Sequence, residues 1–113
     1  MINIDTSVEN DVATIILNGD VDASSSLDLD NAINGAKNDG HKKILIDAQE
    51  LHYISSAGLG VFMSYIKDFE KEQIKLVLFG LNEKVLNVFK MLGLDQLLSI
   101  ESNAEDALKS VNA

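Results

Sequence analysis

The sequence predicts one domain of the α/β class, in which helices flank a mixed central sheet in the order β-β-α-β-α-β-α-β-α. The length of 113 residues suits one compact domain over residues 1–113. The first two apolar segments are separated by a short polar turn, which predicts an antiparallel hairpin. After them, segments with helical spacing alternate with short apolar runs, a pattern typical of strands covered on both faces.

The N-terminal part predicts the hairpin and a first helix. Residues 2–8 alternate between apolar and polar side chains, and residues 12–17 form a second strand after a polar turn. Ser25 and Asp28 then have the spacing of a capping box. The helix that follows ends at Gly40. Its apolar face consists of Leu29, Ala32, Ile33 and Ala36.

The middle of the chain predicts two buried strands around an amphipathic helix. Residues 44–46 form a short apolar run, as does the segment 74–79, which Gly80 closes. Between them, the segment after Ser56 carries apolar residues at helical spacing. We therefore expect a strand, a helix and a strand here.

The C-terminal part predicts two more helices around an edge strand. Asn82 is placed to cap a helix that Gly93 ends. Residues 97–100 form a short edge strand, and Ser102 and Glu105 have the spacing of a second capping box before the last helix.

Composition excludes several classes of function. The chain has 9 basic and 18 acidic residues, a net charge of −9, which argues against direct binding of nucleic acid. It has no cysteine, so disulfides, thiolate zinc sites and cysteine nucleophiles are ruled out. The first residues of the sequence lack the basic and apolar regions of a signal peptide, and no apolar run reaches the roughly 20 residues that span a bilayer. We expect a cytoplasmic protein with no membrane insertion.

The segment from Tyr53 to Val61 carries the most information about function. It joins a loop to a helix and places two serine hydroxyls at the helix N-terminus. Such a position suits a capping serine, and it also tolerates the negative charge of a phosphoserine. From physical chemistry alone the capping role is favoured, because caps are common and regulatory serines are not.

The run Ile54-Ser55-Ser56-Ala57-Gly58-Leu59-Gly60 resembles the signature of the STAS domain family. Asn18-Gly19-Asp20-Val21-Asp22 is similar to the segment that follows the family's second strand, and residues 44–47 are similar to its central strand. Residues 89–94 and 105–108 resemble its two C-terminal helices. The resemblance covers the whole chain, and it is to the anti-sigma factor antagonists of bacterial partner-switching systems.

The resemblance implies a binding switch with no catalysis and no cofactor. By position, Ser56 is the residue that a serine kinase, itself the anti-sigma factor, phosphorylates; a metal-dependent serine phosphatase would reverse the modification. Ser55 stands where the family usually has Asp, and Ala57 where a second hydroxyl is common. Ser55 is therefore a rival acceptor.

The unphosphorylated domain is expected to bind the kinase and the phosphorylated one to release it. The expected partner surface comprises Asp20, Asp22, Ser24, Ser55, Ser56, Ala57, Gly58, Leu59 and Gly60. For Asp20 and Asp22 a solvated turn is the simpler interpretation without the resemblance. The alternative function is a non-phosphorylated STAS subunit in a lipid- or anion-transport complex.

Other patterns that resemble sites are weaker. Asp47 ends an apolar run, as in a receiver domain, but that fold begins strand-helix; Asp47 is expected to satisfy backbone groups that follow. The segment that starts at Gly58 and Gly60 begins like a dinucleotide-binding fingerprint, but Met63 stands where that motif has its third glycine. Asp20, Asp22 and Ser24 have calcium-loop spacing, but Ser25 and Asn31 replace the glycine and glutamate that the loop needs.

The two histidines and two of the methionines complete the candidates. His41 and His52 form no metal-spaced pair, and His52 near the serines lacks an orienting acid for hydrolysis. Met63 and Met91 occupy apolar helical positions and are expected in the core or on a partner face.

Overall fold

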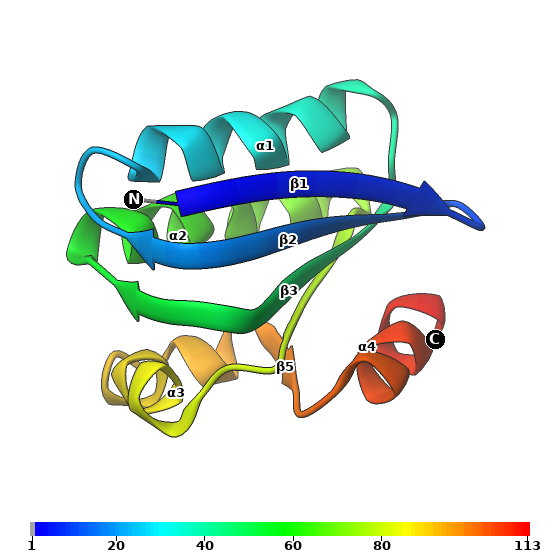
Figure 1. Ribbon diagram of the computed structural model, residues 1–113. Helices are drawn as coiled ribbons and strands as arrows, with labels where there is room; N and C mark the ends of the chain where they lie inside the picture. Colours follow the sequence, from blue (N-terminus) through cyan, green and yellow to red (C-terminus); the bar gives the residue numbers. More distant parts are fainter. Residues whose placement is uncertain (1) are drawn as a thin grey trace.

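A computed structural model describes residues 2–113 and shows five strands, four α-helices and one 3-10 helix (Figure 1). The elements in chain order are β1 (Ile2–Glu9), β2 (Val12–Val21), α1 (Ser26–Asn38), β3 (Lys43–Ile54), α2 (Ser56–Glu72), β4 (Lys75–Phe79), α3 (Glu83–Met91), η1 (Leu94–Gln96), β5 (Ser99–Glu101) and α4 (Ala104–Asn112). The predicted α/β class and element order are confirmed, with η1 as an addition.

The strands form one mixed sheet in the order β1-β2-β3-β4-β5. β1 and β2 are antiparallel, with Ile2 opposite Gly19 and Glu9 opposite Val12, so the predicted hairpin forms. β3, β4 and β5 each run parallel to the preceding strand. Parallel neighbours require crossover connections, and α1, α2 and α3 supply them.

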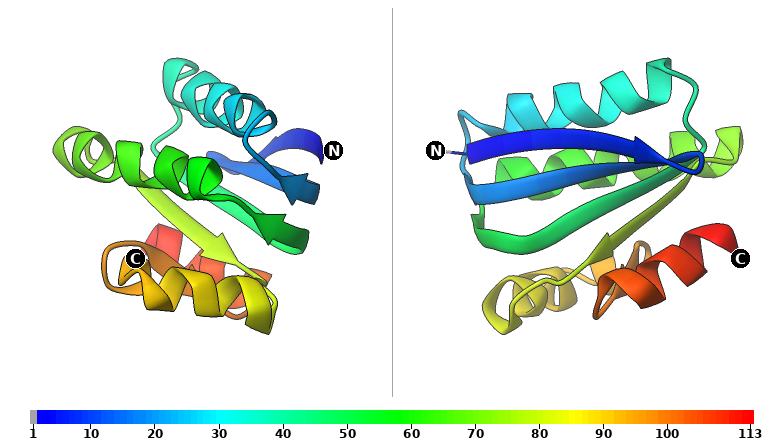
Figure 2. Two further views of the ribbon diagram at one scale, coloured as in Figure 1. Left: turned by 90° about the vertical axis from the view of Figure 1, so that its left-hand side faces the viewer. Right: turned by 45° about the vertical axis from the view of Figure 1, so that its right-hand side comes forward.

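Two apolar clusters lie on opposite faces of the sheet because successive strand residues point to opposite sides. The larger cluster joins the sheet to α1, α2 and α3, and it includes Phe62 of α2 and Phe89 of α3, whose ring centroids are 6.1 Å apart. The smaller cluster joins Ala107 and Val111 of α4 to the sheet. Both views in Figure 2 show the sheet between α4 and the pair α1 and α2.

Two polar contacts join α1 to α2, one of them from a core residue. The hydroxyl of Tyr65 donates to Asp30 Oδ1 at 2.6 Å, and Tyr65 itself is buried. Burial and then the hydrogen bond to Asp30 raise the pKa of Tyr65 above its ordinary value. Near the C-terminal ends of both helices, Lys37 Nζ lies 3.2 Å from Glu72 Oε2.

Both predicted capping boxes are wrong. Ser25 has helical dihedral angles and makes no capping bond; its hydroxyl is used within the preceding loop. At α4 the cap is Asn103, one residue later than predicted, and its side chain accepts from the backbone N–H of Asp106 at 2.8 Å. By contrast, Asn82 caps α3 as predicted and Gly93 follows its end with a φ of 72°.

Strand lengths also differ from the prediction. β2 continues to Val21 and β3 to Ile54, whereas the apolar runs indicated strands ending at residues 17 and 46. The segment before Ser55 is therefore strand and not loop. β5 covers Ser99–Glu101 and not the predicted 97–100, because the N–H groups of Leu97 and Leu98 still donate to the Leu94 carbonyl in the turn that follows η1.

Candidate functional site

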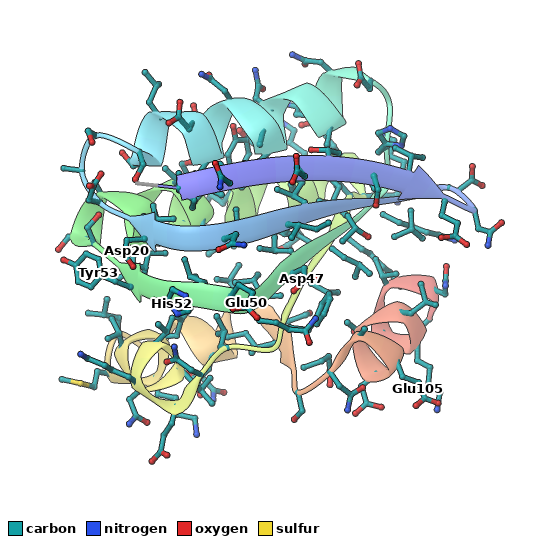
Figure 3. All side chains as sticks on the ribbon, in the orientation of Figure 1. Asp20, Asp47, Glu50, His52, Tyr53 and Glu105 are labelled. Atoms are coloured by element: carbon teal, nitrogen blue, oxygen red, sulfur yellow. The ribbon has the colours of Figure 1, made fainter. Side chains whose placement is uncertain are left out.

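The structure brings the two predicted halves of the partner surface together at the carboxyl ends of β2 and β3. Asp20 pairs with Tyr53 and Val21 with Ile54 in the parallel ladder. The N–H of Ser55 then donates to the carbonyl of Val21 at 2.8 Å, which continues the ladder by one residue. Figure 3 shows Asp20 and Tyr53 side by side at this edge of the sheet.

Ser55 is the N-cap of α2, as the capping interpretation predicts. Its backbone is extended, with φ −84° and ψ 171°, and its hydroxyl oxygen accepts from the N–H of Gly58 at 3.2 Å. The carbonyl of Ser55 accepts the first helical bond, from Leu59 at 3.0 Å. The half-buried Ser55 hydroxyl therefore serves the helix.

Ser56 occupies the first helical position and has a different environment. Its side chain is exposed, and its hydroxyl has no hydrogen-bond partner within residues 2–113. The N–H groups of Ser56 and Ala57 likewise have no acceptor in this described part of the chain. Free N–H groups at the start of a helix favour a negative group nearby. One hydroxyl of the pair is therefore structural and the other is available.

The two glycines of the motif have different roles. A Cβ at Gly58 would lie 2.7 Å from side-chain atoms of both Ile54 and Val21, so only glycine lets α2 approach the strand ends this closely. A Cβ at Gly60 would meet nothing within 4 Å. Gly60 is exposed, and in a helix interior it costs about 1 kcal/mol relative to alanine. Packing within residues 2–113 does not explain Gly60.

Leu59 and Gly58 are buried, with Leu59 only 4% exposed, so their assignment to the partner-contacting surface is wrong. Leu59 belongs to the larger core cluster. Because both residues pack against the core, they fix the start of α2, on which the exposed Ser56, Ala57 and Gly60 lie.

Asp22 organises the loop between β2 and α1. Its carboxylate Oδ1 accepts from the N–H of Ser25 at 2.8 Å, the hydroxyl of Ser24 at 2.8 Å and the hydroxyl of Ser25 at 2.9 Å. These bonds, the backbone N–H of Ser25 first, hold the pKa of Asp22 well below its ordinary value. Asp22 is thus an ordered part of the turn and not merely a solvated acid. Ser24 is exposed beside it, and Asp20 is half-buried.

The site contains acidic residues and no basic ones. Residues 20–28 include Asp20, Asp22 and Asp28 but no lysine or arginine, and residues 53–66 carry no charged side chain. A phosphate on the Ser56 hydroxyl would therefore meet helix N–H groups but no cation from either segment. Its charge would remain directed toward solvent or a partner.

Of the exposed apolar side chains near the site, the sequence indicates only Met63, which is expected in the core or on a partner face. Tyr53, at the end of β3, is 50% exposed, and Leu27, in the first turn of α1, is 63% exposed. Met63 is 51% exposed and lies one turn beyond Gly60 on α2, so it is on the surface and not in the core. Leu27 carries a sequence signal, because it falls outside the apolar spacing of its helix.

Asp47 fulfils its predicted role, since its Oδ1 accepts from the N–H of Gln49 at 3.1 Å. His52 is exposed on β3 (Figure 3), and Met91 is 84% exposed, so Met91 is not a core residue.

Within residues 2–113 no group of three or more metal-ligating side chains is close enough to hold a metal ion. None of the helices described for residues 2–113 is long and apolar enough to cross a membrane.

Comparison with known proteins identifies the family. The STAS domain model matches residues 3–107. The chain belongs to the STAS domain family. The anti-sigma-B factor antagonist of Listeria monocytogenes is 30% identical over 105 residues, which cover 93% of this chain and 91% of the relative.

Solved structures of STAS proteins share this fold. The crystal structure of an anti-sigma factor antagonist from Mycobacterium paratuberculosis has a TM-score of 0.92 at 18% identity, covering 100% of this chain and 96% of that one. The Bacillus cell fate determinant SpoIIAA in its phosphorylated form has a TM-score of 0.71 at 20% identity, covering 98% and 99% of the two chains. The resemblance drawn from the 54–60 motif is therefore confirmed at the level of family and fold.

Proposed function

We propose that this STAS domain is an anti-sigma factor antagonist, which binds a serine kinase that is also an anti-sigma factor and releases it when Ser56 is phosphorylated. The single observation that carries the proposal is that the two serines differ in burial and in hydrogen bonding. Ser55 is half-buried and caps α2, whereas Ser56 is exposed with an unbonded hydroxyl in the described part of the chain. The relatives named as anti-sigma-B factor antagonists support the class of function.

Ser56 is preferred over Ser55 as the acceptor for a geometric reason. A kinase must reach the hydroxyl oxygen, and that of the half-buried Ser55 is already engaged by the N–H of Gly58 at the start of α2. Transfer to Ser56 breaks no hydrogen bond within residues 2–113. A phosphate at this position also lies at the end of the helix that favours negative charge. The same fold exists in a phosphorylated Bacillus protein, which supports this chemistry.

The kinase-binding surface consists of exposed residues and the half-buried Asp20, from β2, the β2–α1 loop, α1, β3 and α2 at one edge of the sheet. It comprises Asp20, Ser24, Leu27, Tyr53, Ser56, Ala57, Gly60 and Met63. Asp22 contributes by holding the β2–α1 loop in shape. A phosphate on Ser56 would add about −1.5 to −2 charges at pH 7 to a surface that has no nearby cation from residues 20–28 or 53–66. Burial of that charge at the interface is costly, so phosphorylation favours release. A metal-dependent serine phosphatase would reset the switch.

The test is phosphate mapping. The purified protein is incubated with ATP and the anti-sigma-type serine kinases encoded near its gene, and modified residues are identified by mass spectrometry. We expect one phosphate, on Ser56, retained in Ser55→Ala and abolished in Ser56→Ala. Phosphate only on Ser55 would overturn the site assignment. If every such kinase binds the protein but modifies neither serine, the regulatory proposal fails and a structural subunit role is favoured.

A further inference from the structure

The sheet face that contacts α4 is only partly covered. α4 packs over β3, β4 and β5, and in Figure 1 no helix lies in front of β1 and β2 on this side. The strand register places Asp5, Ile16 and Asp47 side by side on this face, with Ser7, Thr14 and Leu45 in the next row. The open area therefore combines apolar and acidic side chains.

A groove of about 400 Å³ runs between α4 and the β1–β2 hairpin. Its floor is apolar and consists of Val12, Leu45 and Phe79, each of which is at least 95% buried in this structure. Leu108 of α4 forms one wall and is 46% exposed. This leucine gains burial only if something enters the groove, because the helix already packs on the sheet through Ala107 and Val111.

The charged side chains that line the groove are both acidic. They are Glu9 on the hairpin and Asp47 on β3, and Asp5 lies beside Ile16 just beyond the groove. Lys43 pairs with Val12 and lies at the end of the groove near Asn112, to whose Oδ1 its Nζ donates at 2.8 Å. Lys75, the next residue along this row, donates to the Ala113 carbonyl, so both cations lie at that end and the acidic side chains lie along the hairpin and β3. Figure 3 shows Asp47 on the open sheet between β3 and α4. An apolar groove with an acidic rim complements a ligand that combines apolar and cationic groups.

We propose that this groove docks a basic amphipathic segment of a partner protein, with an apolar side chain against Leu108 and cationic side chains toward Asp5, Glu9 and Asp47. A second copy of this chain is disfavoured, because each copy carries a net charge of −9. The groove lies on the sheet face, away from Ser56 at the carboxyl edge, so both surfaces can be occupied together. The proposal does not depend on phosphorylation.

The test uses a synthetic 14-residue peptide with leucines on one helical face and lysines on the other, and a matched peptide with glutamates in place of the lysines. Amide shifts of the ¹⁵N-labelled protein locate binding, and calorimetry measures the dissociation constant. We expect the lysine peptide to shift amides of Ser7, Thr14 and Leu108, and the glutamate peptide not to bind. Leu108→Ala and Asp5→Asn/Glu9→Gln should each weaken binding at least five-fold.

Matched variants on the opposite side of the sheet separate this site from general charge attraction. Leu27→Ala on α1 removes the same side-chain atoms as the leucine variant of the groove, and Asp68→Asn/Glu70→Gln on α2 removes the same two charges as the acidic variant. Both should leave the affinity for the lysine peptide within two-fold. Equal weakening in groove and control variants, or shifts centred on α1 and α2, would overturn the proposal. A dimer that forms through Leu108 without peptide binding would overturn it too, since the occupant would then be a second copy.

Discussion

At the scale of single residues, the two adjacent serines make different contributions to stability. Ser55→Ala removes the cap of α2 and should lower the free energy of unfolding by about 1 kcal/mol. Ser56→Ala removes an exposed hydroxyl and should change it by less than about 0.5 kcal/mol. Urea denaturation followed by circular dichroism measures both. Equal losses in the two variants would show that the hydroxyls are not distinguished as the structure indicates.

The two glycines of the motif provide a second matched pair. Gly58→Ala forces a Cβ against Ile54 and Val21 and should destabilise the fold by about 1–3 kcal/mol. Gly60→Ala meets open space and should stabilise it by up to about 1 kcal/mol. If Gly60 allows close approach of the kinase, the same alanine should nevertheless weaken kinase binding. A more stable Gly60→Ala protein that binds the kinase as well as wild type would remove this role.

Asp22 determines part of the response to acid. Its folded-state pKa is depressed, so its stabilising contribution is complete above the ordinary carboxyl pKa near 4 and is lost as the pH falls toward the lower folded-state value. Asp22→Asn should therefore show a shallower loss of stability between about pH 5 and pH 2 than the wild type does. Urea midpoints across this range measure the slope. Asp28→Asn, with the same change in net charge, is the control. If its stability falls with pH as gently as that of Asp22→Asn, the acid response does not come from Asp22.

At the scale of elements, the hydroxyl of Tyr65 couples α1 to α2. Tyr65→Phe deletes the donor to Asp30 while keeping the buried ring. The centroid of that ring lies 5.0 Å from the centroid of the Phe69 ring. The free energy of unfolding should fall by about 1–2 kcal/mol. The acceptor is a carboxylate, but Asp30 is only half-buried and water still hydrates it in part. Thermal unfolding monitored by calorimetry measures it. A variant as stable as wild type would show that this hydrogen bond is offset by solvation.

Apolar periodicity predicts the order and type of the elements but not all of their ends. The second half of β3 contains exposed Gln49, Glu50, His52 and Tyr53. These side chains do not follow an apolar pattern because this part of the sheet lacks a covering helix on one face, although the backbone ladder continues to Ile54. The Ser25 capping box fails for a different reason, because the Ser25 hydroxyl oxygen accepts from the backbone N–H of Asp22 at 2.8 Å and not from the first turn of α1.

At the scale of the whole molecule, the sequence motif predicts where the site lies, but only the fold determines which residues reach the surface. Asp20 and Tyr53 are far apart in sequence and neighbours in the sheet. Leu59, inside the motif, is a core residue, while Met63, outside it, is exposed. Residue type alone could not separate these cases, because burial depends on how α2 meets the strand ends.

The central claim is that phosphate on Ser56 controls binding without unfolding the domain. An acidic group at this helix N-terminus should leave stability unchanged or raise it by about 0.3–1 kcal/mol. Calorimetric titration of the kinase with unmodified protein, protein phosphorylated on Ser56, and Ser56→Ala tests the claim most directly. We predict equal affinity for the unmodified and Ser56→Ala forms, and at least ten-fold weaker binding of the phosphorylated, fully folded form. Equal affinity of all three would contradict the account.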